Sequence, residues 1–260
     1  MRKILILFVL CLPIRVRAQE VVPVGTVLPV QLNSTISLKS MPGQVISARV
    51  MQNIPRLTGV RVRAGSKLVG RILEVTPPRT NSGPAVAFVF DTLVVKREKY
   101  AIVTDLRVLA SPLEIDNAQI PDNGPDRGTP PEAYTTIQVG GEVVYRGGGP
   151  VKNRERVVAE PVPDGVLGAL RASDLGNCRA AIDGNSQPQA LWLFSTNACG
   201  VYGIPGLEIA HAGRTEPQGR IVLISKKNDL KIRGGSGMLL RVIGPASPAV
   251  SVLSESSLNQ

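Results

Sequence analysis

The sequence predicts an all-β protein: a small β-barrel or sandwich closed by a C-terminal hairpin, with a second, irregular β lobe held by one disulfide. Three observations support this fold class. Short runs alternate apolar and polar residues with the period of a half-buried strand, turn residues such as glycine and proline separate these runs, and helical spacing is never sustained for long. We therefore expect strands joined by tight turns.

The strands are clearest between residues 25 and 75. Leu28–Leu32 and Ile46–Val50 alternate apolar residues with others, and Met41-Pro42-Gly43 is a turn signal between them. After a second turn at Ala64-Gly65-Ser66, Leu68–Val75 is apolar on both faces with few exceptions. This last run predicts a strand that is covered on both sides.

Two further strands are expected before residue 110. Val86, Phe88 and Phe90 alternate along one run, and a second run, Ile102–Val108, follows the charged turn Lys96–Lys99. This is a hairpin pattern. Residues 22–110 therefore predict an N-terminal lobe of about six strands, which is enough for a small sandwich or barrel. Residues 111–156 are rich in proline and glycine and predict an irregular connection.

Residues 157–244 predict the second β lobe. Val166–Ala172 is short and fits one or two helical turns, while Ala190–Phe194 is an apolar run suited to a buried strand. The only tryptophan, Trp192, lies among aliphatic neighbours, so a place in the core is favoured over carbohydrate stacking.

A late segment of the chain resembles an early one. Leu230–Ile243 can be aligned with Val60–Leu73, and both contain a strand, a glycine turn and a strand. Chance matching is the alternative, because the chain is rich in glycine, valine and arginine. If the match is structural, residues 219–244 form a hairpin that completes the sheet begun near the N-terminus. Residues 245–260 predict a disordered tail.

The first 18 residues have the pattern of a secretory signal peptide. Arg2 and Lys3 precede an apolar core, Ile4–Ile14, and the small residue Ala18 marks the expected cleavage site. The apolar core is too short to span a bilayer as a stable helix, so a retained anchor is the weaker alternative and no transmembrane helix is expected in the mature chain. We expect Sec-type export to the periplasm or the extracellular space.

The mature chain is mildly basic. Loss of four lysine and arginine residues with the signal lowers the formal net charge from +10 to +6. An excess of this size is ordinary for a protein surface, and an exported protein seldom meets nucleic acid, so no nucleic-acid partner is expected. The alternative is contact with a cell-wall glycan or another envelope polyanion through Arg61, Arg63 and Arg71, if these side chains face solvent.

Only two cysteines, Cys178 and Cys199, remain after signal removal. An even pair in an oxidising compartment predicts one disulfide. A loop of this length stabilises a fold by about 3 kcal/mol in the chain-entropy model. Two thiols and one histidine cannot make a four-ligand zinc site without carboxylates, so no metal site is expected.

The opening stretch, Gly25–Val75, resembles the β-barrel domain of TrbI-type conjugation-pore proteins. The similar phrases are Leu28–Leu32, Pro42–Val50 and Arg63–Gly70. In that family they begin a barrel that lines an envelope-spanning secretion channel. This chain differs because it has a cleavable signal in place of an inner-membrane helix and no amphipathic helical pair for an outer-membrane pore. The resemblance implies a related barrel.

The sequence contains no pattern that predicts catalysis. It lacks a phosphate-binding loop, and the glycines of Gly234–Gly237 are wrongly spaced for a nucleophile elbow. His211 lies in a strand-like run, and no carboxylate pair suited to acid–base chemistry is evident. We therefore expect a non-enzymatic protein without cofactors.

Two function classes follow from these observations. The first is an exported envelope or secreted β-protein that acts by protein interaction or assembly, with another envelope protein or a second copy as partner. The second is the glycan or polyanion module. Exposed aromatic residues clustered with arginines in one groove favour the second class, whereas an exposed apolar patch or an open sheet edge favours the first.

Overall fold

The computed structural model describes residues 21–55, 59–80, 82–119, 135–141, 143–145, 150–153, 156–162, 165–170, 178 and 185–245. The expected signal peptide and nearly all of the expected C-terminal tail lie outside these residues. Among the described residues, none of the helices has the length and apolar character needed to cross a bilayer.

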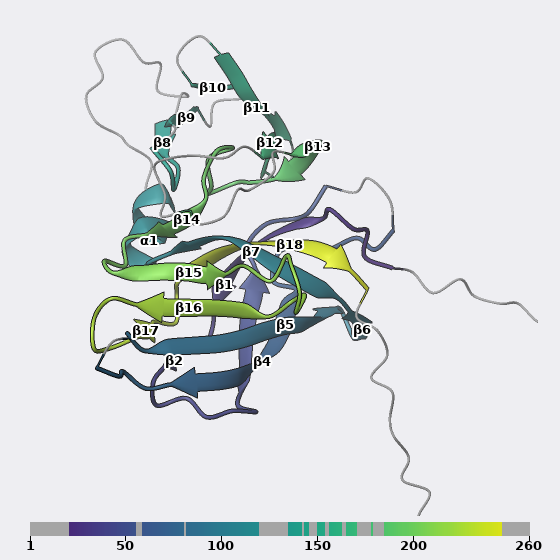
Figure 1. The fold of residues 1–260 in the computed structure, drawn as a ribbon. Coiled ribbons are helices and arrows are strands. Elements are labelled where there is room, and N and C mark those ends of the chain that lie inside the picture. Colours follow the sequence, from purple (N-terminus) through teal and green to yellow (C-terminus); the bar gives the residue numbers. More distant parts are fainter. Residues whose placement is uncertain are drawn as a thin grey trace, which may run out of the picture.

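Most of the described strands belong to one sheet, which confirms the all-β class (Figure 1). Its order is β14-β7-β18-β1-β3-β4-β5-β16-β15, and β6 pairs with β5. The ten strands are β1 Val27–Leu32, β3 Val45–Val50, β4 Lys67–Thr76, β5 Ala85–Val95, β6 Glu98–Ala101, β7 Val103–Ala110, β14 Gly200–Tyr202, β15 Leu207–His211, β16 Ile221–Ser225 and β18 Gly237–Gly244.

Smaller elements gather at one end of this sheet (Figure 1). They include a four-stranded sheet in the order β10-β11-β12-β13, the pair β8–β9 and one helix, α1. A further pair joins β2 to β17. The bounds are β2 Ile36–Ser37, α1 Pro112–Gln119, β8 Thr135–Ile137, β9 Val143–Tyr145, β10 Val151–Asn153, β11 Arg156–Val162, β12 Gly165–Leu170, β13 Asn185–Ala190 and β17 Lys231–Ile232.

The main sheet contains two halves with the same strand register. We call β3, β4 and β5 half A, and β1, β18 and β7 half B. The ladder from Val45↔Arg71 in half A has its counterpart from Val27↔Arg241 in half B, residue by residue. The halves meet where β1 pairs with β3, and there Gln31 lies opposite its own counterpart, Arg49. The halves are therefore related by a local twofold axis.

The β-bulges repeat as well. In half A the neighbours Val69 and Gly70 pair with residues on either side of Asp91, which is left unpaired in the ladder. In half B the neighbours Leu239 and Leu240 pair in the same way with residues on either side of Arg107. A bulge leaves one residue without a partner across the strand pair and changes the direction of its side chain. Arg107 is therefore the counterpart of Asp91.

The glycine turns that precede β4 and β18 are also equivalent. Gly65 has φ 83° and Gly235 has φ 90°, a region that favours glycine over residues with a Cβ. The amide of Ser66 donates to the carbonyl of Arg63 at 3.0 Å, and the amide of Ser236 donates to that of Arg233 at 3.2 Å. The similarity between the two segments is therefore structural rather than chance.

The C-terminal region completes the sheet, but not as a hairpin. β18 lies between β1 and β7, whereas β16 pairs with β15 and β5. Among the described strands, no continuous ladder closes the sheet into a barrel. At one end of the seam between β5 and β7, the amide of Ile102 donates to the carbonyl of Asp91. At the other end the β15–β16 hairpin lies in the seam, and the amide of Leu106 donates to the carbonyl of Ala212. The strands enclose an apolar core that includes Leu28, Ile46, Leu68, Phe88, Phe90 and Leu240.

Other local expectations for the second lobe are corrected. The region of the expected helical turns, Val166–Ala172, contains strand β12, and Ala190–Phe194 is buried but lies mostly in an irregular turn after β13. Trp192 has φ 35° and is partly buried. Helix α1, which buries Ile115 and Ala118, lies in the region expected to be an irregular connection.

Candidate functional site

The smaller elements cover the outer face of half B. One apolar cluster joins Val27, Val108 and Leu239 of the main sheet to residues beyond β7. The covering side chains include Leu170, Leu191, Phe194 and Ala198. Val27 is consequently only 1% exposed. This packing fixes the second lobe against β1, β7 and β18.

The equivalent face of half A has no such cover among the described residues. Val45, the counterpart of Val27, is 66% exposed. Val69, Thr92 and Val94, the counterparts of Leu239, Val108 and Ala110, are all partly exposed. We call these four residues the open face. Because removal of apolar surface from water lowers the free energy, a face of this kind is suited to contact with another molecule.

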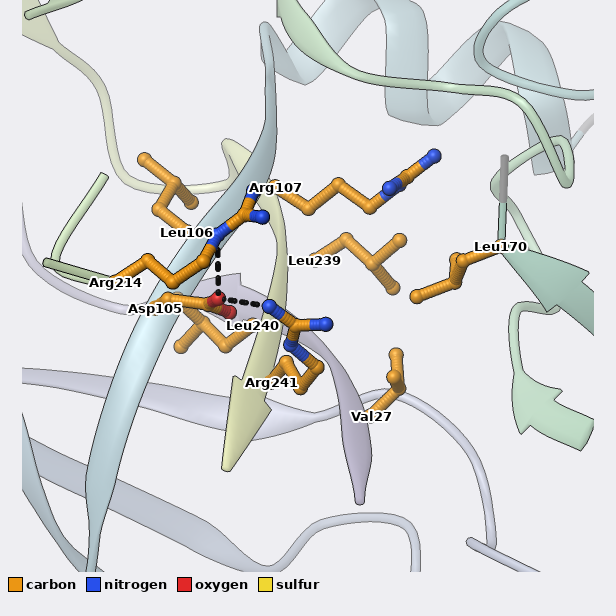
Figure 2. A pocket seen from close by; sticks show the side chains of 9 residues that line it. All are labelled: Val27, Asp105, Leu106, Arg107, Leu170, Arg214, Leu239, Leu240 and Arg241. Atoms are coloured by element: carbon orange, nitrogen blue, oxygen red, sulfur yellow. Dashed lines mark hydrogen bonds and ion pairs between the residues drawn. The ribbon is translucent and has the colours of Figure 1, made fainter. Parts of the chain in front are cut away.

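A second feature is a pocket between β7, β18 and the covering lobe (Figure 2). Its cavity has a volume of about 10 Å³, and the space between its walls reaches about 290 Å³ only when the part open to solvent is counted. We call it the arginine pocket. Its lining residues are Val27, Asp105, Leu106, Arg107, Leu170, Arg214, Leu239, Leu240 and Arg241.

Two of the pocket's arginines approach one acid. Asp105, whose side chain is 5% exposed, accepts a hydrogen bond from Nη2 of Arg241 at 2.6 Å. Nε of Arg214 lies 3.7 Å from the same carboxylate oxygen. The lining therefore carries three cationic groups and one anionic group, and the electrostatic potential inside is positive.

Arg107 is the most confined of the three arginines. Its residue is 4% exposed, and its Nε donates to the carbonyl of Ala198 at 2.8 Å. Nη2 is buried and has no hydrogen-bond acceptor among the described residues. Burial, together with a smaller effect of the nearby charge of Arg241, lowers the pKa of Arg107 to about 10. The group is still cationic at neutral pH.

The disulfide between Cys178 and Cys199 is present, as predicted, with 5.9 Å between the two Cα atoms. Cys199 is fully buried and follows Ala198, whose carbonyl receives the hydrogen bond of Arg107. The covalent link therefore holds the segment that anchors one side of the arginine pocket.

The three arginines predicted to meet a polyanion are exposed but are not gathered in one groove. Arg61 and Arg63 alternate with buried Val60 and Val62 ahead of the turn into β4. Arg71 lies further along β4, and the strand from Lys67 to Arg71 alone is about 13 Å long. It forms an ion pair with Asp91. A role in polyanion contact stays a prediction for these residues.

His211 lies at the end of β15, beside a turn. Its Nδ1 lies 2.6 Å from the carbonyl oxygen of Arg220 and its Nε2 lies 3.2 Å from the hydroxyl of Thr215. Within the part of the chain that the structure describes, histidine, cysteine and acidic side chains do not gather into a group of three that could hold a metal ion.

The sequence reasoning missed Asp105, Arg107, Arg214 and Arg241. The alternation along Ile102–Val108 correctly indicated a strand, but it said nothing of Arg107, which lies between two of the alternating apolar residues. The one available signal was the alignment of Arg71 with Arg241. In the structure both arginines pair with an acid, Arg71 with Asp91 and Arg241 with Asp105.

The chain was compared with family models, with curated proteins and with solved structures, and none of the three comparisons gives a match. The resemblance of Gly25–Val75 to TrbI-type pore proteins therefore stays a prediction. Function has to be argued from the open face and the arginine pocket themselves.

Proposed function

We propose that this protein is exported and acts without catalysing a reaction, by binding another protein of the cell envelope through the open face of half A. The observation that carries the proposal is the contrast between Val45, 66% exposed, and its counterpart Val27, 1% exposed. The same position in the same local fold is covered in one half and left bare in the other.

The chain itself indicates what kind of surface fits. On half B the equivalent face packs against aliphatic and aromatic side chains, among them Leu170, Leu191 and Phe194. Full burial of a valine side chain contributes about 1.5 to 3 kcal/mol. Exposed Lys67 and Arg71 lie on β4 close to the open face and would supply a polar rim. A partner with an apolar centre and acidic edges is expected.

The compartment is the second part of the proposal. The disulfide and the lack of apolar membrane helices among the described residues are compatible with an extracytoplasmic protein. The signal-peptide pattern of residues 1–18 supports export to the periplasm or the extracellular space.

Site-specific photo-crosslinking in exporting cells tests the proposal. A photoreactive residue at position 45 should give one adduct of defined mass, and a Thr92→Arg change on the same face should remove it. The control is position 113, because Leu113 is 67% exposed and lies on α1, which, among the described residues, packs against half B and not half A. An adduct of twice the chain mass identifies self-association, and any other mass identifies a different protein.

The substitution Val45→Glu gives a quantitative check. We expect it to weaken binding of the cross-linked partner by about tenfold to a hundredfold, because an unpaired carboxylate in an apolar contact costs about 1 to 3 kcal/mol. The melting temperature should barely change, since Val45 is exposed. No adduct at position 45, or the same adducts at position 113, would contradict the proposed function.

A further inference from the structure

We propose that the arginine pocket binds a small oxyanion, a carboxylate or a phosphate group, which is held by Arg107 and Arg241. This site is distinct from the open face, and its ligand chemistry differs from the apolar contact proposed there. Four observations lead to it: the equivalence of the two halves, the unpaired buried guanidinium, the lining of the pocket and its access to solvent.

The equivalence of the halves shows what is missing. In half A, Arg71 forms an ion pair with Asp91, the residue in the bulge of β5. In half B the counterpart of Arg71 is Arg241, and the counterpart of Asp91 is another arginine, Arg107. Two cations therefore occupy the positions at which the other half of the same sheet has a cation and an anion.

Asp105 compensates for only part of this difference. It occupies the position equivalent to Val89 in half A, directly opposite Arg241 across the β7–β18 pair. It accepts a hydrogen bond from Arg241. Arg107 keeps one hydrogen bond, to Ala198, and its buried Nη2 has no acceptor among the described residues. A buried cationic donor without an acceptor is costly, and an oxyanion would relieve that cost with a charge-assisted hydrogen bond.

The pocket has an entrance, and at rest it holds little more than one water molecule, so a bound oxyanion has to displace the arginine side chains around it. In Figure 2 the side chains of Arg107 and Arg241 extend to the same side of β7 and β18, and Leu170 of β12 faces them across the pocket. The side chains of Arg214 and Arg241 are 23% and 17% exposed, so the pocket reaches solvent along them. Val27, Leu170 and Leu239 form an apolar wall opposite the charged side chains.

The test uses the whole exported chain and two simple probes, inorganic phosphate and acetate, each compared with chloride at the same ionic strength. Either probe should raise the melting temperature of the protein beyond the effect of chloride, because a ligand that binds only the folded state stabilises it. Arg107→Gln should weaken probe binding about tenfold to a hundredfold, as expected for loss of a hydrogen bond between charged groups.

The matched control is Arg71→Gln, which removes the equivalent arginine of half A and should leave the response to phosphate and acetate intact. Val45→Glu should leave it intact too, so that failure of this inference and failure of the proposed function can be told apart. The Nε–H signal of Arg107 in nuclear magnetic resonance spectra of the unsubstituted protein gives a second readout if Arg107→Gln does not fold. It should shift with either probe and not with chloride.

Equal responses of the unsubstituted protein and Arg107→Gln, or an unmoved Arg107 signal, would show that Arg107 is a purely structural residue and would overturn the inference. Mass spectrometry of small molecules released on denaturation then identifies the source of the anion. A released carboxylate or phosphate indicates a free ligand. Binding of the probes without a released molecule indicates a group carried by a partner, and both results support the site.

Discussion

At the scale of single residues, the two halves use opposite charges at the same bulge. Asp91 in half A is 25% exposed at its side chain and pairs with Arg71 at the surface. Arg107 in half B is buried beside Arg241 and close enough to it for their charges to interact. Sequence reasoning could not see this contrast, because an arginine between Leu106 and Val108 has the pattern of an outward-facing strand residue. Its burial depends on a lobe that lies about 60 residues or more further along the chain.

The burial of Asp105 leads to a prediction on stability. Asp105→Asn removes the carboxylate that lines the arginine pocket, the only one there among the described residues. It should lower the free energy of unfolding by about 3 to 5 kcal/mol, because loss of one partner leaves buried charge uncompensated. Urea unfolding followed by circular dichroism measures the change.

The counterpart substitution in half A is the control for Asp105. Asp91→Asn breaks an ion pair whose arginine side chain is 54% exposed, and solvent screens such pairs. It should cost about 1 kcal/mol or less. Similar losses for the two substitutions would show that the pocket does not raise the cost of an unpaired charge.

At the scale of the elements, the chain's local chemistry predicts turns better than it predicts strand partners. The glycine turns at Gly65 and Gly235 follow from their own residues, and both were found in the expected place. The position of β18 between β1 and β7 does not follow from any local pattern, because those partners are separated from it by most of the chain. The expected hairpin of residues 219–244 was wrong for that reason.

The equivalence of the turns predicts equal costs for alanine. Gly65→Ala and Gly235→Ala should each lower the free energy of unfolding by about 1 to 2 kcal/mol, the cost of a left-handed backbone for a residue with a Cβ. Neither new Cβ would meet an atom closer than 3.5 Å, so the backbone alone decides the cost.

Gly244 at the end of β18 is the control for the two turns. Its backbone is not left-handed, and nothing lies within 4 Å of an added Cβ. Gly244→Ala should therefore leave the denaturation midpoint almost unchanged. A loss at Gly244 as large as at the turns, or losses at the two turns that differ several-fold, would argue against their equivalence.

At the scale of the whole molecule, the main sheet brings the first and last described strands, β1 and β18, side by side. Removal of Gly219 and everything after it deletes β16, β17 and β18, so β1 and β7 lose their shared partner. We expect this shortened chain to aggregate, because it exposes long unpaired edges. Size-exclusion chromatography of the refolded chain measures the outcome.

A chain that ends at Pro245 is the control, because it keeps every described strand. It should remain monodisperse. A chain that ends at Pro112 and is nevertheless soluble, monomeric and cooperatively folded would show that the N-terminal strands form an independent domain. The single sheet would then be two bodies in contact.

The place of β18 also constrains the order of events during biosynthesis. A ribosome adds residues from the N-terminus, so β1 and β7 both leave the exit tunnel long before their common neighbour exists. Half A, whose three strands follow one another closely, can pair early, while half B has to wait for residues 237–244. The sheet of half B is therefore completed only after residues 237–244 have been synthesised.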